Sequence, residues 1–121
     1  MRFPMSVVLA LPLAVAAGPV SAAPPIEAAF GNTIVTTFPD GQTQHLWFEQ
    51  DGAYTAQGRR GQASSGRWSL RGNEVCLQQL RPFPAPVVYC TPVPQDALTA
   101  TWTSKALNGQ QIKLKVVRGK P

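Results

Sequence analysis

Short runs of alternating apolar and polar residues, separated by glycine-containing links, recur along most of the chain. Ile112 and Leu114 alternate with lysines, and Trp68 and Leu70 alternate with arginine and serine. An alternation with a period of two is typical of a strand that has one buried face and one solvated face. No segment of the sequence shows a sustained helical period, although residues 24–30 favour one short helical turn. The pattern therefore predicts an all-β protein.

Three of the links have the same form, a three-residue connection that ends in Asp-Gly or Asn-Gly. Each suits a type I turn whose final glycine adopts the left-handed conformation. The links are Pro39-Asp40-Gly41, Gln50-Asp51-Gly52 and Leu107-Asn108-Gly109. A fourth turn, at Gly72-Asn73, predicts a tight two-residue hairpin.

Pairing the strands outward from these links places apolar residues opposite apolar residues, and a shift of one residue would destroy that match. The expected pairs are Ile34 with Leu46, Phe48 with Tyr54, Trp102 with Leu114, Ala100 with Val116, Leu70 with Val75 and Trp68 with Leu77. Arg71 is expected opposite Glu74.

The resulting map is a single small antiparallel meander of about eight strands, either barrel-like or a sandwich, with one disulfide. We expect barrel-like closure, because closure removes the exposed edges of the sheet. The strands are expected near residues 32–38, 43–49, 53–57, 65–71, 74–80, 87–91, 98–105 and 110–118.

The two cysteines, Cys76 and Cys90, are placed to form that disulfide. They flank Arg81–Pro86, a segment whose three prolines cannot continue a ladder, and Phe83 lies midway between them. In a hairpin centred on Phe83, Cys76 faces Cys90. Closing a loop of this length contributes about 3 kcal/mol in the chain-entropy model. A redox or metal-binding pair would need a Cys-x-x-Cys spacing or supporting histidines, which the sequence lacks.

The N-terminus has the three parts of a secretory signal peptide. Arg2 precedes an uncharged run over residues 3–17, and a Gly-Pro break leads to small residues before Ala23. A membrane anchor is the alternative, but the apolar run is shorter than the roughly 20 residues that a span needs. We therefore expect residues 1–22 to be removed, leaving a single β-rich domain over residues 23–121 that is exported to the periplasm or medium, without a membrane span.

Chemically reactive groups are scarce. His45 is the only histidine, and in its strand it is expected to be half exposed. Glu27 and Glu49 are the only carboxylates that turns and a facing arginine leave free, and they are far apart in sequence. There is neither a metal-ligand spacing nor a phosphate-binding glycine loop. We expect no metal, no cofactor and no enzymatic activity, with an uncharacterised hydrolase as the alternative.

The chain is basic, with 11 lysines and arginines against six acidic residues. Arg59 and Arg60 are expected at a hairpin tip, and Arg67 and Arg71 on one face of the next strand. Four guanidinium groups on one side could bind an anionic polymer or an acidic protein; a solvated, solubilising surface is the alternative. An exposed Trp47 beside the histidine would add a partner contact, whereas core packing would remove it.

The residues Asp51-Gly52-Ala53-Tyr54, Gly66-Arg67-Trp68-Ser69-Leu70 and Gly72–Leu77, with the later Cys90, resemble a pattern of small exported bacterial β-meander proteins of uncharacterised function. More loosely, Gly66-x-Trp68 and the meander resemble lipocalin-like barrels. The resemblance covers residues 31–91 and implies an exported β-fold without a particular activity.

Two functions follow. The first is an exported, non-enzymatic and monomeric binding module of the cell envelope. It docks an anionic polymer or envelope protein, with no specific nucleic acid, or inhibits a hydrolase. The alternative is a small lipocalin-like carrier of an apolar ligand. A cavity lined by Phe38, Phe48, Tyr54 and Trp68 would favour the carrier, and a filled interior would exclude it.

Overall fold

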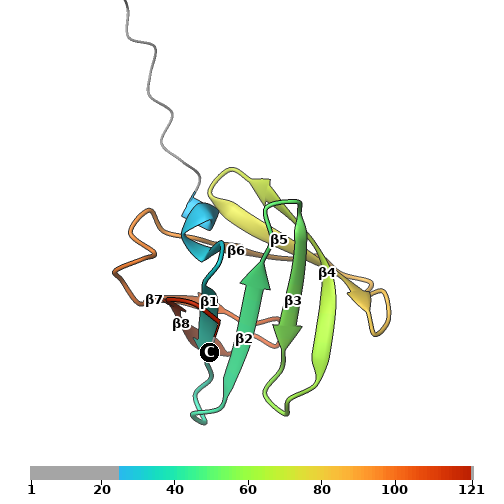
Figure 1. The fold of residues 1–121 in the computed structure, drawn as a ribbon. Helices are drawn as coiled ribbons and strands as arrows, with labels where there is room; N and C mark the ends of the chain where they lie inside the picture. Colours follow the sequence, from blue (N-terminus) through green and yellow to red (C-terminus); the bar gives the residue numbers. More distant parts are fainter. Residues whose placement is uncertain (1–24, 121) are drawn as a thin grey trace, which may run out of the picture.

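The computed structural model describes residues 25–120, and the predicted signal peptide lies outside them. The described residues form one eight-stranded antiparallel sheet that curls into a nearly closed barrel (Figure 1). A 3-10 helix, η1 (Pro25–Ala29), precedes the strands, which are β1 (Thr33–Thr37), β2 (Thr43–Phe48), β3 (Ala53–Gln57), β4 (Ala63–Arg71), β5 (Glu74–Arg81), β6 (Tyr89–Pro92), β7 (Trp102–Lys105) and β8 (Gln111–Val117).

The strands are joined as a meander, with one connection that closes the sheet on itself. The order in the sheet is β6-β5-β4-β3-β2-β1-β8-β7, so β1 pairs with both β2 and β8. Every pairing is antiparallel. The predicted fold class is confirmed, and closure is barrel-like.

Turn chemistry and register agree with the sequence pattern at most positions. The glycines that end the three expected links, Gly41, Gly52 and Gly109, all have positive φ angles, between 85° and 96°. The pairs Ile34–Leu46, Phe48–Tyr54, Leu70–Val75, Trp68–Leu77, Arg71–Glu74 and Trp102–Leu114 form as expected.

One predicted pair is wrong. Ala100 does not face Val116, because β7 begins only at Trp102, and Val116 pairs with Ile34 on β1 instead. The cause lies in the preceding link, where the amides of Thr99 and Ala100 both donate to the carbonyl of Asp96 at 3.0 Å. These bonds coil the link and keep the backbone out of the ladder.

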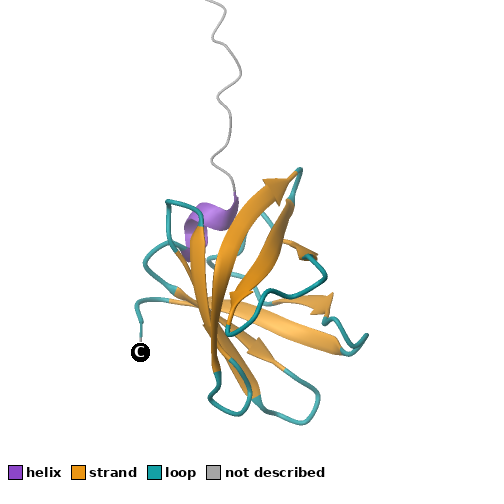
Figure 2. Cartoon of the chain, turned by 90° about the vertical axis from the view of Figure 1, so that its right-hand side faces the viewer, coloured by secondary structure: helices purple, strands orange, loops and turns teal. Residues whose placement is uncertain are grey.

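The barrel has a seam between its first and last strands in sheet order, β6 and β7, which do not form a backbone ladder. Side chains bridge the seam instead. The Tyr89 hydroxyl donates to the Lys105 carbonyl at 2.6 Å, and the hydroxyls of Thr91 and Ser104 share a hydrogen bond. Figure 2 shows the strands fanning around the interior from a direction at right angles to Figure 1.

The expected disulfide joins Cys76 on β5 to Cys90 on β6. The two residues face each other in the register, as the symmetric spacing about Phe83 predicts, and their Cα atoms are 4.0 Å apart. The bond therefore holds β6, a strand at the seam, against the rest of the sheet. Within residues 25–120, no helix has the length and apolar character needed to cross a membrane.

The two ends of the barrel are built differently. We call one end the mouth; it carries the β1–β2, β3–β4, β5–β6 and β7–β8 links. The opposite end, the base, carries η1 and the remaining links (Figure 1). Apolar residues of η1 and of the β6–β7 link close the base, because Ile26, Ala29 and Ala97 are each at most 2% exposed and belong to the core.

Candidate functional site

The inward side chains do not fill the barrel. A cavity of about 580 Å³ lies inside the barrel and opens at the mouth. Alternate residues of the strands form its walls, as the two-residue period dictates. The strand residues that line it include Ile34, Leu46, Phe48, Tyr54, Ala56, Val75, Leu77, Trp102, Ile112 and Leu114.

Residues from all four mouth links form the rim of the cavity. Phe38 lies at the end of β1, Arg59 in the β3–β4 turn, Phe83 and Val87 in the β5–β6 loop and Leu107 in the β7–β8 turn. These links surround the open end of the barrel, and the strand pairing lies below them. A molecule that enters along the barrel axis therefore passes between links and does not separate paired strands.

Arg59 supplies the only charged side chain among the described residues that line the cavity. Its guanidinium carbon lies 4.1 Å from the centroid of the Phe38 ring, an arrangement in which the cation is attracted to the ring face. One guanidinium nitrogen is 3.9 Å from a carboxylate oxygen of Asp40. The Arg59 side chain is about one third exposed, so it remains open to a ligand at the mouth.

An aromatic cluster lies toward the base. Phe48 is 6.3 Å from Tyr54 and 6.2 Å from Trp68, measured between ring centroids, and Phe30 is 5.7 Å from Trp68. Phe48 and Tyr54 face the cavity, whereas Trp68 is not among its lining residues. Of the four aromatic residues proposed to line a carrier's cavity, Phe38, Phe48 and Tyr54 therefore do so, and the expectation for Trp68 is wrong.

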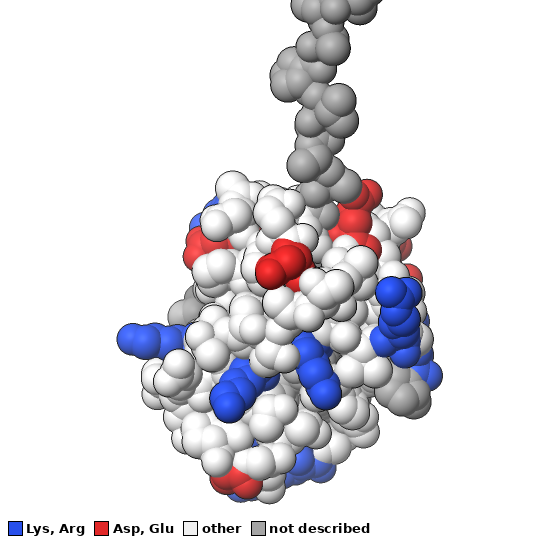
Figure 3. All heavy atoms as spheres, turned by 90° about the vertical axis from the view of Figure 1, so that its left-hand side faces the viewer, with Lys and Arg blue, Asp and Glu red and all other residues white. Residues whose placement is uncertain are grey.

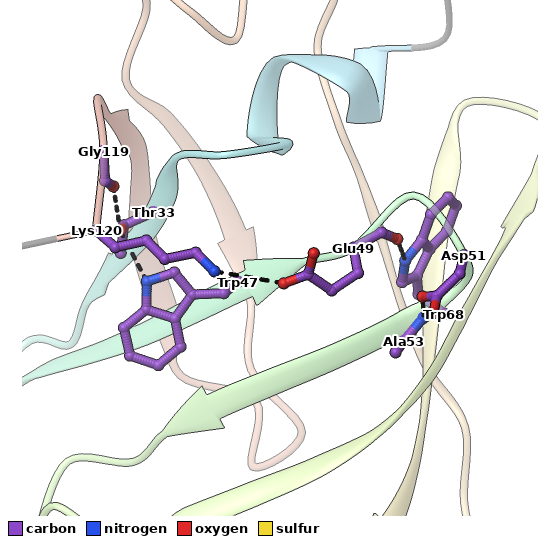
Figure 4. A network of polar contacts seen from close by, with 8 residues as sticks. All are labelled: Thr33, Trp47, Glu49, Asp51, Ala53, Trp68, Gly119 and Lys120. Carbon is purple, nitrogen blue, oxygen red and sulfur yellow. Dashed lines mark hydrogen bonds and ion pairs between the residues drawn. The ribbon is translucent and has the colours of Figure 1, made fainter.

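Trp68 is held outside the cavity by a contact at the base. Its indole Nε1 donates to the Glu49 carbonyl at 2.8 Å (Figure 4). Trp68 is half-buried, and the Glu49 carbonyl that accepts from its indole lies beyond the end of β2 rather than in the barrel interior. The ring consequently packs between Phe30 and Phe48.

Two polar groups in the cavity wall are buried. Burial raises the pKa of the Tyr54 phenol above its ordinary value of 10.0, because removal from water disfavours the phenolate. The indole Nε1 of Trp102 has no hydrogen-bond partner within residues 25–120, and neighbouring atoms cover it. Tyr54 is thus neutral at physiological pH, and Trp102 contributes an unsatisfied donor to the wall.

The cavity suits a neutral or anionic molecule that is mostly apolar. Its described lining contains neither a carboxylate that would neutralise a cation nor a histidine that would transfer a proton near neutral pH. Polar residues such as Gln44, Gln79 and Thr91 are interspersed among the apolar ones. Within the described part of the chain, no group of three or more His, Cys, Asp or Glu residues could hold a metal ion.

The four arginines proposed as one docking face lie in different places. Arg59 and Arg60 are in the β3–β4 turn at the mouth, whereas Arg71 ends β4 at the base. The nine residues of β4 separate them, roughly 30 Å in an extended strand. Arg67 lies on the outer surface, and its guanidinium donates to the Asp51 carbonyl at 2.9 Å. Only the Arg59–Arg60 pair therefore flanks the cavity.

Trp47 lies on the outer face of the barrel, half-buried rather than in the core. Its indole donates to the Thr33 hydroxyl at 2.8 Å, and that hydroxyl donates to the Gly119 carbonyl at 2.7 Å (Figure 4). His45 lies beside it, with ring centroids 6.0 Å apart. Beyond this network, Lys120 donates to the Glu49 carboxylate at 3.3 Å. Trp47 thus supports the Thr33 hydroxyl, which holds the C-terminal segment to the barrel.

The fold and cavity define the chain as a small disulfide-bonded meander barrel with an internal cavity that opens at one end. No protein-family model, no curated protein and no solved structure is similar to it in the comparisons. Function must accordingly be inferred from the cavity itself.

The sequence patterns placed Phe83 and Leu107 in links between strands, but they did not identify these two residues, or Val87, as the rim of a cavity. The sequence did contain one indication of the rim, which is an apolar residue at a link position where a polar residue is usual. Phe83 lies at the centre of a proline-rich loop, and Leu107 lies beside Asn108-Gly109. Turn positions favour Gly, Pro, Asn, Asp and Ser, and here apolar residues in the links mark the opening of the cavity.

Proposed function

We propose that this protein is a non-enzymatic carrier that binds one small, largely apolar molecule inside its barrel. The observation that carries the proposal is the open cavity of about 580 Å³, which lies within the roughly 300–1,000 Å³ range of small-molecule sites. A purely structural barrel of this size would fill its interior with side chains. Here an unfilled space is lined by six aromatic residues instead, which are Phe38, Phe48, Tyr54, Phe83, Tyr89 and Trp102.

Export belongs to the same proposal. Disulfides persist in oxidising compartments outside the cytoplasm, and the Cys76–Cys90 bond supports such a location. An extracytoplasmic carrier must keep an apolar molecule from water, and a rigid barrel with a closed base does so.

The position of Arg59 favours an acidic group on the ligand. The guanidinium lies at the mouth, where the polar end of an elongated molecule would remain while its apolar part entered the barrel. An anion there would compete with Asp40, whose carboxylate is at the long distance of 3.9 Å. A charge-assisted hydrogen bond to a ligand carboxylate is worth about 1.5–3 kcal/mol.

Filling the cavity tests the proposal directly. Ala56 is 4% exposed and faces the cavity, and Thr55, the preceding residue of β3, is exposed on the outer surface. We expect Ala56→Phe to weaken binding of an environment-sensitive apolar fluorophore at least tenfold, with the circular dichroism spectrum unchanged. Thr55→Phe, the matched control, should bind as the wild type does. Equal binding by a folded Ala56→Phe variant would overturn the proposal.

A pair of probes tests the acidic end separately. A long-chain aliphatic carboxylate and the alcohol of equal chain length are titrated against wild type and Arg59→Gln, with displacement of the fluorophore as the readout. Arg59→Gln should lower affinity for the carboxylate about tenfold or more and leave affinity for the alcohol unchanged. Equal losses for both probes would mean that Arg59 acts through packing on Phe38.

A further inference from the structure

Phe83, Val87 and Leu107 are three of the large apolar side chains that are exposed around the mouth, where Leu80 and Val88 are exposed as well. The exposed fractions are 60% for Phe83, 53% for Val87 and 70% for Leu107. All three also line the cavity, so they form its lip rather than isolated surface positions. Exposed apolar residues gathered at one place mark an interaction surface.

Charge is distributed unevenly between the two ends. Of the six acidic residues only Asp40 lies at the mouth, where it is already beside Arg59. The other five lie toward the base and are Glu27, Glu49, Asp51, Glu74 and Asp96. The basic residues of the mouth are Arg59, Arg60, Arg81 and Lys105.

The space-filling view agrees with this division. In Figure 3 most acidic side chains of the visible face lie in its upper part, and most basic side chains lie across its middle and lower parts. With four basic residues and one acidic residue, the mouth is therefore net positive, and its apolar lip lies at the same end of the barrel.

We propose that the mouth of the barrel docks on an anionic phospholipid surface. Phe83, Val87 and Leu107 would enter the boundary between headgroups and acyl chains, while Arg60 and Arg81 contact lipid phosphates. This combination of an apolar lip and peripheral cations fits a bilayer, which presents apolar chains beneath a negative surface. An acidic polymer would interact with the basic residues, but it would leave the apolar lip exposed to water.

This inference goes beyond the proposed function, since it needs only the outer surface of the mouth and no ligand in the cavity. Arg60 and Arg81 do not line the cavity, so replacing them leaves the proposed carrier site intact. Docking in this orientation would place the opening of the cavity against the bilayer. An apolar ligand would then pass between the acyl chains and the barrel without crossing water.

Flotation with lipid vesicles tests the docking. The protein is used as it accumulates in its host, so the N-terminal region is common to every variant. Vesicles of phosphatidylglycerol and phosphatidylcholine are compared with vesicles of phosphatidylcholine alone. We expect binding to the anionic vesicles only, and weaker binding as salt rises, because exposed charges are screened within about 8 Å at physiological ionic strength.

Matched pairs of variants locate the surface. Each basic residue at an anionic bilayer contributes about fivefold to partitioning, so Arg60→Ser with Arg81→Ser should reduce it roughly 25-fold. Arg71→Ser with Arg118→Ser removes the same charge from exposed residues of the base and should reduce it less than threefold.

A second matched comparison tests the apolar lip. Phe83→Ser with Leu107→Ser should abolish most of the binding that remains in high salt. Leu70→Ser with Leu98→Ser, which are 40% and 48% exposed and lie toward the base, should have little effect.

Three results would overturn the docking proposal. Equal losses from the mouth and base arginine pairs would assign binding to net charge. Unchanged binding by the Phe83 and Leu107 variant, with equal affinity for a soluble polyanion, would identify an acidic polymer as the partner. No binding of wild type to anionic vesicles at low salt would exclude a lipid surface. Binding of the fluorophore, measured without vesicles, reports on the carrier function independently.

Discussion

Gly66 is the position where the smallest possible change should damage the barrel most. It lies on β4, faces inward, and pairs with Tyr54 on β3 and Gln79 on β5 at a register irregularity. A Cβ atom added there would lie 1.9 Å from the Gln78 carbonyl oxygen and 3.0 Å from the Gln79 Cα. Real Cβ atoms essentially never approach other heavy atoms closer than 3.0 Å, so β5 would have to move by about 1 Å.

The cost of Gly66→Ala follows from that displacement. Lengthening ladder hydrogen bonds of about 2.9 Å by about 1 Å takes them past the distance at which they hold. Two lost bonds cost about 1–3 kcal/mol, and overpacking adds about 1–3 kcal/mol. The expected loss of about 2–6 kcal/mol is a large part of the 5–15 kcal/mol that stabilises a typical domain.

Urea denaturation followed by circular dichroism measures this loss. Gly109→Asn is the control, because Gly109 has a φ of +85° with nothing within 4 Å of an added Cβ, and asparagine tolerates that conformation. We expect Gly109→Asn to cost about 1 kcal/mol or less, and Gly66→Asn to cost at least as much as Gly66→Ala. A Gly66→Ala variant as stable as wild type would refute the packing described for β4 and β5.

Three further predictions concern stability. Replacing both Cys76 and Cys90 with alanine should lower the free energy of unfolding by about 3 kcal/mol, measured by urea denaturation, and an unchanged midpoint would contradict the loop-closure estimate. The folded pKa of Tyr54 is raised, so its contribution is complete below pH 10 and declines as pH rises through the folded value. The urea midpoint of wild type should therefore fall above pH 10 more steeply than that of Tyr54→Phe, and parallel curves would exclude the effect. Trp102→Phe removes a buried donor without a partner, which costs about 1–3 kcal/mol when unsatisfied. It should be at least as stable as wild type in thermal melts, whereas a large loss would show that indole packing dominates.

The strand registers could be predicted because each depends on local information. An Asp-Gly or Asn-Gly link fixes where a hairpin turns, and matching apolar residues such as Ile34 and Leu46 fixes the face. The Cys76–Cys90 pair was predictable for the same reason, since a proline-rich loop marks the centre of its hairpin. Residues 98–101 were predicted wrongly because hydrogen bonds to the Asp96 carbonyl, which alternation does not encode, coil that link.

The cavity could not be predicted from the sequence. Alternation shows that Ala56 and Tyr54 face inward, but whether inward side chains fill a barrel depends on the width of the barrel and on all their volumes together. The direction of the Trp68 ring likewise depends on an acceptor 19 residues away, the Glu49 carbonyl. The division of charge between the two ends becomes visible only once the links are assigned to an end.

The seam between β6 and β7 gives the barrel one place where it can open. Backbone amide hydrogens within a ladder exchange with solvent only when the paired strands separate. At the seam, β6 and β7 separate once a few side-chain hydrogen bonds break, such as the bond from Tyr89 to Lys105. Hydrogen–deuterium exchange should therefore begin at these two strands and reach β2 and β3, the central strands in sheet order, last. Because β6 is tied to β5 through Cys90, the mobile side of that opening would be β7, so the barrel would unroll from its C-terminal hairpin.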